Sequence, residues 1–188
     1  EDGRAFALNA ALPGRIGQPV TCLSQASKGV MLIGCVSSMW RFVGDPALGT
    51  PDVTPLSLTD GVSGLFAATL ASDGIMLVHS RSGMLVVNTA GDVVPLSHSS
   101  LSSGITIEDP TDRVVVVQRD PGRMFTHAFL THSADPDDPE SWWTYAEKVG
   151  GYQRTGAGFF EQQMATTGLE VTAACLFRGR PVFGTRNG

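Results

Sequence analysis

One stretch of this chain occurs twice. The run GVMLI at residues 29–33 returns as GIMLV at residues 74–78, 45 residues later. Both copies end with a similar segment, which is DVTPLS at residues 52–57 and DVVPLS at residues 92–97. An internal repeat of this length, built from short apolar segments, predicts a repeat architecture such as a β-propeller or a related array.

Within each copy the apolar segments are short and are separated by turns. Residues 30–34 and 75–78 are continuous apolar runs, which are typical of strands covered on both faces. A further strand opens at Met39 and, 45 residues later, at Met84; residues 39–43 alternate as an outer strand with one wetter face does. Four antiparallel strands in about 40–45 residues form a propeller blade. The predicted fold class is therefore all-β, a β-propeller-like array of four-stranded antiparallel blades.

The chain of 188 residues is long enough for about four such units in a single β-propeller domain or a fragment of one. The expected units cover residues 20–58, 65–98, 105–149 and 171–188, and the incomplete last unit is completed by residues 3–18. In the enlarged third unit, residues 142–145 are expected to be the outer strand and residues 150–158 part of a long loop. Whether the units form a small ring or an arc of a larger propeller stays open.

Charge and cysteine content exclude several classes of protein. A net charge of −5 and a pI near 5.2 argue against nonspecific binding to nucleic acid or to an anionic membrane surface. No apolar run approaches the roughly 20 residues that a membrane span needs. The three cysteines, Cys22, Cys35 and Cys175, have neither the number nor the spacing of a disulfide framework or a zinc motif, so we expect three buried thiols.

The acidic and histidine residues do not form a convincing catalytic or metal site. The acidic run at residues 135–140 lacks the glycine of an EF-hand bend, which favours solvated turn residues, although calcium binding stays open. His127 and His132 are five residues apart, so on one strand they face opposite sides. His79 and Ser80 are adjacent on a predicted strand and also point apart. We predict no catalytic residue, no metal site and no cofactor.

Aromatic and basic residues supply the candidates for partner binding. Alternation along a strand turns one ring of the pair Trp142 and Trp143 outward, where it can anchor an interface. Trp40, by contrast, is expected to pack in the core or between blades because of its place in the repeat. The candidate partner-binding residues are Trp142, Trp143, Tyr145, Tyr152, Arg154, Arg178 and Arg180.

Two segments resemble blades of bacteriophage tail proteins, namely the nozzle and tail-tube components of short-tailed phages. They are residues 65–83, which begin LFAATLASDG and end SRSG, and residues 177–185, FRGRPVFGT. The resemblance implies an oligomeric structural protein of the virion tail without catalytic residues. Its implied partners are other copies of itself and neighbouring structural proteins.

Two other function classes stay open: a propeller enzyme that acts on glycans, as a hydrolase or a lyase, and a non-viral protein-interaction propeller. The enzyme needs acids or a tyrosine that converge at the mouth of the ring. The positions expected to line the centre of the ring are small or apolar and include no carboxylate; they are Thr21, Leu23, Ala67, Thr69 and Ala173. We therefore predict a structural or assembly protein rather than an enzyme.

Overall fold

A computed structural model describes residues 16–44, 52–71, 75–88, 90–96, 113–132, 141–146, 158–163 and 171–186. For residues 113, 131, 132, 141–146 and 158–163 it describes the backbone alone. Every element of secondary structure assigned within these ranges is a β-strand, and the strands pair in antiparallel sheets. The prediction of an all-β, antiparallel protein is confirmed.

The strands form four sheets, each built from segments that are consecutive in the chain. Sheet 1 pairs β1 (Val20–Ser27), β2 (Val30–Cys35), β3 (Met39–Val43) and β4 (Asp52–Ser57) in that order. Sheet 2 pairs β5 (Ala68–Leu70), β6 (Met76–Ser80), β7 (Gly83–Val87) and β8 (Val93–Pro95). Sheet 3 pairs β9 (Arg113–Asp120), β10 (Phe125–His132), β11 (Ser141–Ala146) and β12 (Gly158–Gln163). Sheet 4 is the hairpin of β13 (Val171–Phe177) and β14 (Arg180–Thr185).

Two of the expected outer strands are inner strands. β11 has a partner on each side, since Trp143 pairs with Ala128 of β10 and with Glu161 of β12. The outer strand of sheet 3 is thus β12, and the prediction for residues 142–145 is wrong in this respect. Likewise, β3 lies between β2 and β4. Strand-like alternation marks one half-exposed face, which inner strands also have, so it does not identify an edge.

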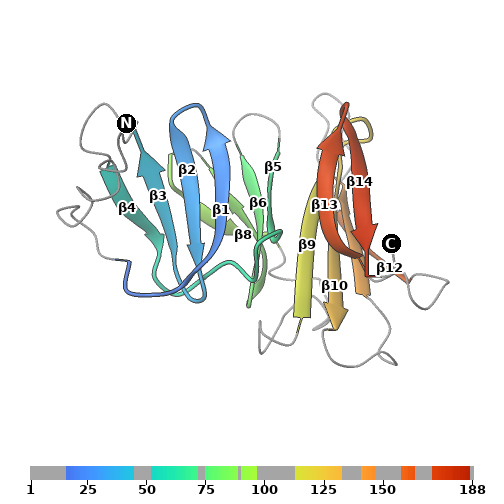
Figure 1. Ribbon diagram of the computed structural model, residues 1–188, viewed down its shortest axis with the longest axis horizontal. Helices are drawn as coiled ribbons and strands as arrows, with labels where there is room; N and C mark the ends of the chain where they lie inside the picture. Colours follow the sequence, from blue (N-terminus) through green and yellow to red (C-terminus); the bar gives the residue numbers. More distant parts are fainter. Residues whose placement is uncertain are drawn as a thin grey trace, which may run out of the picture.

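The sheets follow one another in a row, and their first strands are neighbours (Figure 1). β1 contacts β5, β5 contacts β9, and β9 contacts β13. Just before β5, Phe66 forms an isolated parallel bridge with Val116 of β9, next to which the Val117 amide donates to the Phe66 carbonyl at 2.8 Å. In the part of the chain that the structure describes, sheets 1 and 4 stand at opposite ends of this row (Figure 1).

The segment between β4 and β5, which we call the connector (residues 58–67), is built into the contact between sheets 1 and 2. The Val62 amide donates to the Cys35 carbonyl at 2.8 Å, and the Thr21 hydroxyl donates to the Val62 carbonyl at 2.8 Å. The side chain of Val62 packs on Gly34 so closely that a β-carbon there would collide with it. The connector therefore acts as part of the core.

Apolar side chains fill the spaces between the sheets. All five residues of β6 are buried, as its continuous apolar sequence predicts for a strand covered on both faces. One cluster joins sheets 1, 2 and 3 and includes Leu32, Met76 and Val115. A smaller cluster joins sheets 3 and 4 around Val116, Phe129 and Val171.

Three further sequence-based expectations concern the cysteines, Trp40 and the residues before β1. Cys22 and Cys35 are buried as predicted, but Cys175 is exposed on sheet 4, so the expectation of three buried thiols is wrong. Trp40 is half-buried and belongs to neither apolar cluster, so its predicted packing in the core or between blades is not confirmed. Of residues 3–18, which were expected to complete the last unit, 3–15 lie outside the described residues, and 16–18 form no strand.

Candidate partner-binding surface

The tip of the β13–β14 hairpin exposes two of the predicted binding residues. Arg178 and Gly179 both have positive φ angles, 51° and 76°, which is the backbone geometry of a two-residue type I′ turn. The turn places the Arg178 guanidinium 5.3 Å from the ring centroid of Phe177, whose side chain is 61% exposed. Arg180 is exposed directly after the turn. Arginine and aromatic side chains are enriched in the centres of protein interfaces.

The neighbouring turn between β9 and β10 adds a third exposed arginine. Arg123 lies 3.8 Å from Asp120 (Nε to Oδ2), and its side chain is 76% exposed. Asp120 is itself held by the turn, because its Oδ1 accepts from the Gly122 amide at 3.1 Å. β9 and β13 run in the same direction, so the two hairpin turns lie at the same end of sheets 3 and 4 (Figure 1).

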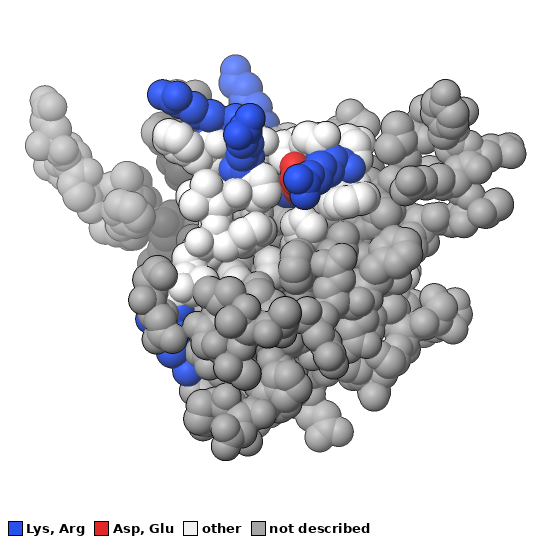
Figure 2. Space-filling view, turned by 90° about the vertical axis from the view of Figure 1, so that its right-hand side faces the viewer, with Lys and Arg blue, Asp and Glu red and all other residues white. Residues whose placement is uncertain are grey.

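Together these turns form a basic surface on an acidic protein. We call the exposed residues Arg123, Phe177, Arg178 and Arg180 the basic surface. Figure 2 shows Lys and Arg side chains gathered along one edge of this side of the molecule, with an acidic side chain among them. Asp120 is the sole acidic residue in residues 113–132 and 171–186, whereas the whole chain carries a net charge of −5. Such a local excess of positive charge complements an acidic partner surface.

The structure describes the other predicted binding residues only in part or not at all. Trp142, Trp143 and Tyr145 lie on β11, where their backbones pair with β10 and β12, but their side chains are outside the description. Tyr152 and Arg154 lie outside the described residues altogether. Arg123 and Phe177 were not predicted from the sequence as companions of Arg178 and Arg180. Pro121 and Gly122 are typical turn residues, but only packing brings this turn beside the turn of another sheet.

A buried serine–histidine pair was also missed. Ser63 Oγ lies 3.0 Å from Nδ1 of His79, and the His79 side chain is completely buried. The Ser63 amide also donates to the His79 carbonyl at 3.0 Å, and the His79 amide donates to the Ala67 carbonyl at 2.8 Å. A nucleophile and base need access to substrate. This pair instead ties the connector to β6, which is a structural role.

His127 lies in an aromatic environment rather than near a metal ligand. It is buried, and its ring centroid is 6.4 Å from that of Phe125, 6.3 Å from that of Phe129 and 6.2 Å from that of Phe183. Burial lowers the pKa of His127 from its ordinary value of 6.5; Asp120 opposes this effect and Arg123 adds to it. Within the described residues, no three His, Cys, Asp or Glu side chains are grouped to hold a metal ion. The acidic run at 135–140 lies outside them.

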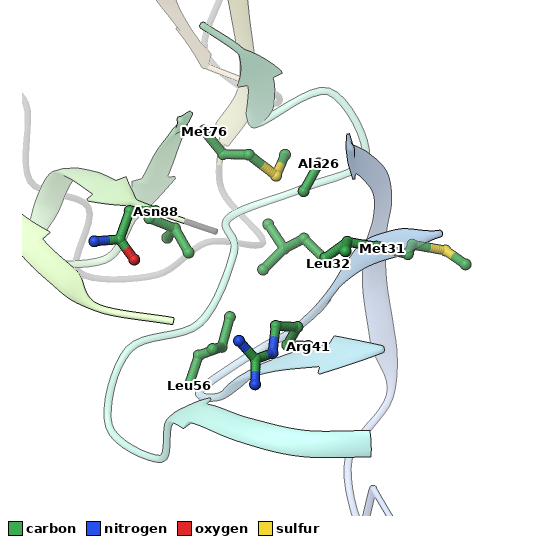
Figure 3. Close-up of a pocket in the computed structure, with 9 residues that line it drawn as sticks. Ala26, Met31, Leu32, Arg41, Leu56, Met76 and Asn88 are labelled. Carbon is green, nitrogen blue, oxygen red and sulfur yellow. The ribbon is translucent and has the colours of Figure 1, made fainter. Parts of the chain in front are cut away.

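A small cavity lies between sheets 1 and 2 (Figure 3). Leu32, Leu56 and Met76 point into it, and Arg41 borders it with its Nη1 donating to the Ala90 carbonyl at 3.1 Å. Its volume is about 10 Å³, which is room for one water molecule at most. The cavity is therefore a packing gap and cannot hold a substrate.

No protein-family model matches the chain, and the search of curated proteins finds no significant match. The described residues include no helix that is long and apolar enough to cross a membrane.

Proposed function

We propose that this chain is a non-catalytic propeller-type scaffold that binds other proteins within a larger assembly. The observation that carries the proposal is the row of first strands β1, β5, β9 and β13, in which each contacts the next. Radial arrays of antiparallel sheets with adjacent inner strands are the architecture of propellers and their fragments. Packed sheets of this kind present turns rigidly, which lowers the entropy lost on binding.

The basic surface is the proposed contact for an acidic protein partner. Phe177 supplies apolar area, and Arg178 and Arg180 supply charge and hydrogen-bond donors that match carboxylates. One feature argues against catalysis as the main activity: the Ser63–His79 pair is buried and ties the connector to β6. The particular assembly that we propose is a virion tail, of the nozzle or tail-tube kind, because residues 65–83 and 177–185 resemble blades of those proteins.

The test compares particles that carry charge-reversed variants. We expect the chain in purified tails, and we expect the double variant Arg178→Glu/Arg180→Glu to reduce its incorporation by about tenfold or more, as loss of a charged interface centre does. The matched control is Lys28→Glu/Arg81→Glu, which makes the same change of charge at exposed turns of sheets 1 and 2. The control should be incorporated normally.

Two results would overturn the proposal. The first is absence of the chain from purified particles. The second is catalytic turnover of a glycan panel by the purified protein, which supports the enzyme alternative instead. Equal incorporation of the two double variants would remove the basic surface from the proposal, because the reversed charges would then make no contact.

A further inference from the structure

Sheet 4 has one face that no other described sheet covers. Ala174 and Phe183 of this sheet pack against Val116 and Phe129 of sheet 3. Since alternate residues of a strand point to opposite sides, their neighbours form the other face. We call it the sheet 4 end face; it consists of Ala173, Cys175, Phe177, Arg180, Val182 and Gly184, of which Phe177 and Arg180 also belong to the basic surface. Phe177 and Val182 are 61% and 47% exposed, which is unusual for two large apolar side chains on one sheet face.

Sheet 1 has an uncovered face at the other end of the row. Leu32 and Arg41 point towards sheet 2, where they border the cavity (Figure 3). Residues that alternate with them point away, as Met31 does in the same view. We call this the sheet 1 end face; it consists of Leu23, Met31, Ile33, Trp40 and Phe42. Leu23 is 59% exposed and the others are half-buried, so these five side chains make the face mainly apolar; the exposed Gln25, which pairs with Met31, lies on the same face.

The sheet 4 end face is equivalent, position by position, to the face of sheet 1 that sheet 2 covers. The first two strands of both sheets contain a β-bulge at the same place, between Val20 and Cys22 and between Val171 and Ala173. Counting from these bulges, Gly184 corresponds to Gly34 and Val182 corresponds to Leu32. Leu32 is 2% exposed, because the connector and sheet 2 cover it, whereas Val182 is 47% exposed.

The sheet 1 end face is equivalent to the face of sheet 2 that packs on sheet 1. The 45-residue repeat relates its four positions on β2 and β3 to positions on β6 and β7. Those counterparts are 0–4% exposed and belong to the apolar core; they are Met76, Val78, Leu85 and Val87. Both end faces are therefore unmatched halves of an interface that the molecule already uses between sheets 1 and 2.

We infer that the sheet 4 end face of one molecule binds the sheet 1 end face of a second copy of this chain, head to tail. The second copy covers Val182 and Gly184 as sheet 2 covers Leu32 and Gly34. Residues 16–19 of the second copy, which precede its β1, pack on Gly184 of the first molecule. They do so as the connector packs on Gly34 through Val62 within one molecule. A head-to-tail contact builds a ring when its rotation closes and a longer array when it does not. The inference rests on the scaffold role proposed above but not on the virion tail.

Two single variants block one end face each. Gly184→Val adds a side chain where a β-carbon meets only Ala173 among the described residues, at 3.6 Å, so the variant can fold but fills the site of the incoming segment. Leu23→Glu puts a charge on the sheet 1 end face at a position that is 59% exposed. The control is Leu58→Glu, because Leu58 is 67% exposed and belongs to neither face.

Sedimentation across a concentration series tests the inference. The parent chain and Leu58→Glu should associate, and each blocking variant alone should be monomeric. An equimolar mixture of the two blocking variants should form dimers and nothing larger, because it contains one intact face of each kind. If Gly184→Val fails to fold, Val182→Glu replaces it, since residue 182 is already 47% exposed.

Cys175 supplies an independent measurement, because it lies on the sheet 4 end face and is exposed. In the associated parent chain its alkylation should be slower than in dilute solution by about tenfold or more, as burial in a contact predicts. In Gly184→Val the rate should not depend on concentration. A parent chain that stays monomeric, blocking variants that still associate, or a mixture that stays monomeric would each overturn the inference. None of these results depends on a virion partner, so this failure and failure of the proposed function are distinguishable.

Discussion

Val62 of the connector lies directly against Gly34 of β2, in the space that a side chain at residue 34 would need. The contact is reinforced by the Val62 amide, which donates to the Cys35 carbonyl at 2.8 Å. A segment outside regular secondary structure therefore joins sheet 1 to sheet 2. The same relation explains why the strand needs glycine at residue 34, although strand interiors ordinarily disfavour it.

Gly34→Ala should destabilise the protein more than a glycine-to-alanine substitution at an open position. The added β-carbon must displace Val62, and overpacking of this kind costs about 1–3 kcal/mol of unfolding free energy. Urea denaturation measures the change. Gly184→Ala is the matched control, because at residue 184 the nearest described atom is in ordinary contact at 3.6 Å, and its effect should stay within about 0.5 kcal/mol. Equal effects of the two substitutions would contradict the packing described for Val62.

Ser63→Ala should lower the free energy of unfolding by about 1–3 kcal/mol, because Nδ1 of buried His79 loses its hydrogen-bond partner. Thermal and urea unfolding give the measurement. Thr59→Ala is the control: its exposed hydroxyl also makes a hydrogen bond, at 3.3 Å to Asp60, but water replaces that bond. A change at Thr59 as large as that at Ser63 would show that burial of the pair is unimportant.

Stability should fall on acidification because of His127. Burial lowers the pKa of this histidine in the folded state, so below its ordinary value of 6.5 the unfolded chain binds more protons than the folded chain. The contribution is complete above about pH 6.5 and decreases as the pH falls from there towards the lowered pKa. His127→Phe, which suits the neighbouring Phe125 and Phe129, should flatten this part of the pH profile of unfolding free energy. An unchanged slope between parent and variant would exclude His127 as its cause.

The three thiols should differ sharply in reactivity. Cys175 is exposed, whereas Cys22 and Cys35 are buried and burial raises the pKa of Cys22 to about 11. Because the thiolate is the reactive form, a maleimide should label one thiol in the dilute folded protein and three after denaturation. Mass spectrometry counts the labels and locates them. Labelling of Cys22 at the rate of Cys175 would contradict the core packing around β1.

The repeat predicted the local structure well, because strand formation depends on the pattern of apolar residues within a short segment. The continuous apolar runs at 30–34 and 75–78 correspond to β2 and β6, and the strands pair with their neighbours in the chain. The outer strand of sheet 3 could not be found in the same way. β12 joins its sheet through backbone hydrogen bonds to β11 across an intervening segment, and such pairing leaves no periodic mark in the sequence.

The candidate site was only half visible from sequence. Arg178 and Arg180 stood out as charges in a turn, but Arg123 belongs with them only because β9 and β13 lie side by side and run the same way. Ser63 and His79 are 16 residues apart and meet through the path of the connector. Contacts of this kind are set by packing between sheets, and their partners share no motif.

The sequence by itself determined that the chain is all-β and that residues 29–33 and 74–78 are two versions of one strand, because hydrophobic period and turn chemistry act locally. Only the tertiary structure decided which faces of these strands are covered. Met76 and Met31 occupy the same place in the repeat, yet Met76 is 1% exposed between sheets, whereas Met31 lies half-buried at the end of the row. Burial depends on the neighbouring sheet, and the sequence of a single strand does not show whether another sheet packs against it.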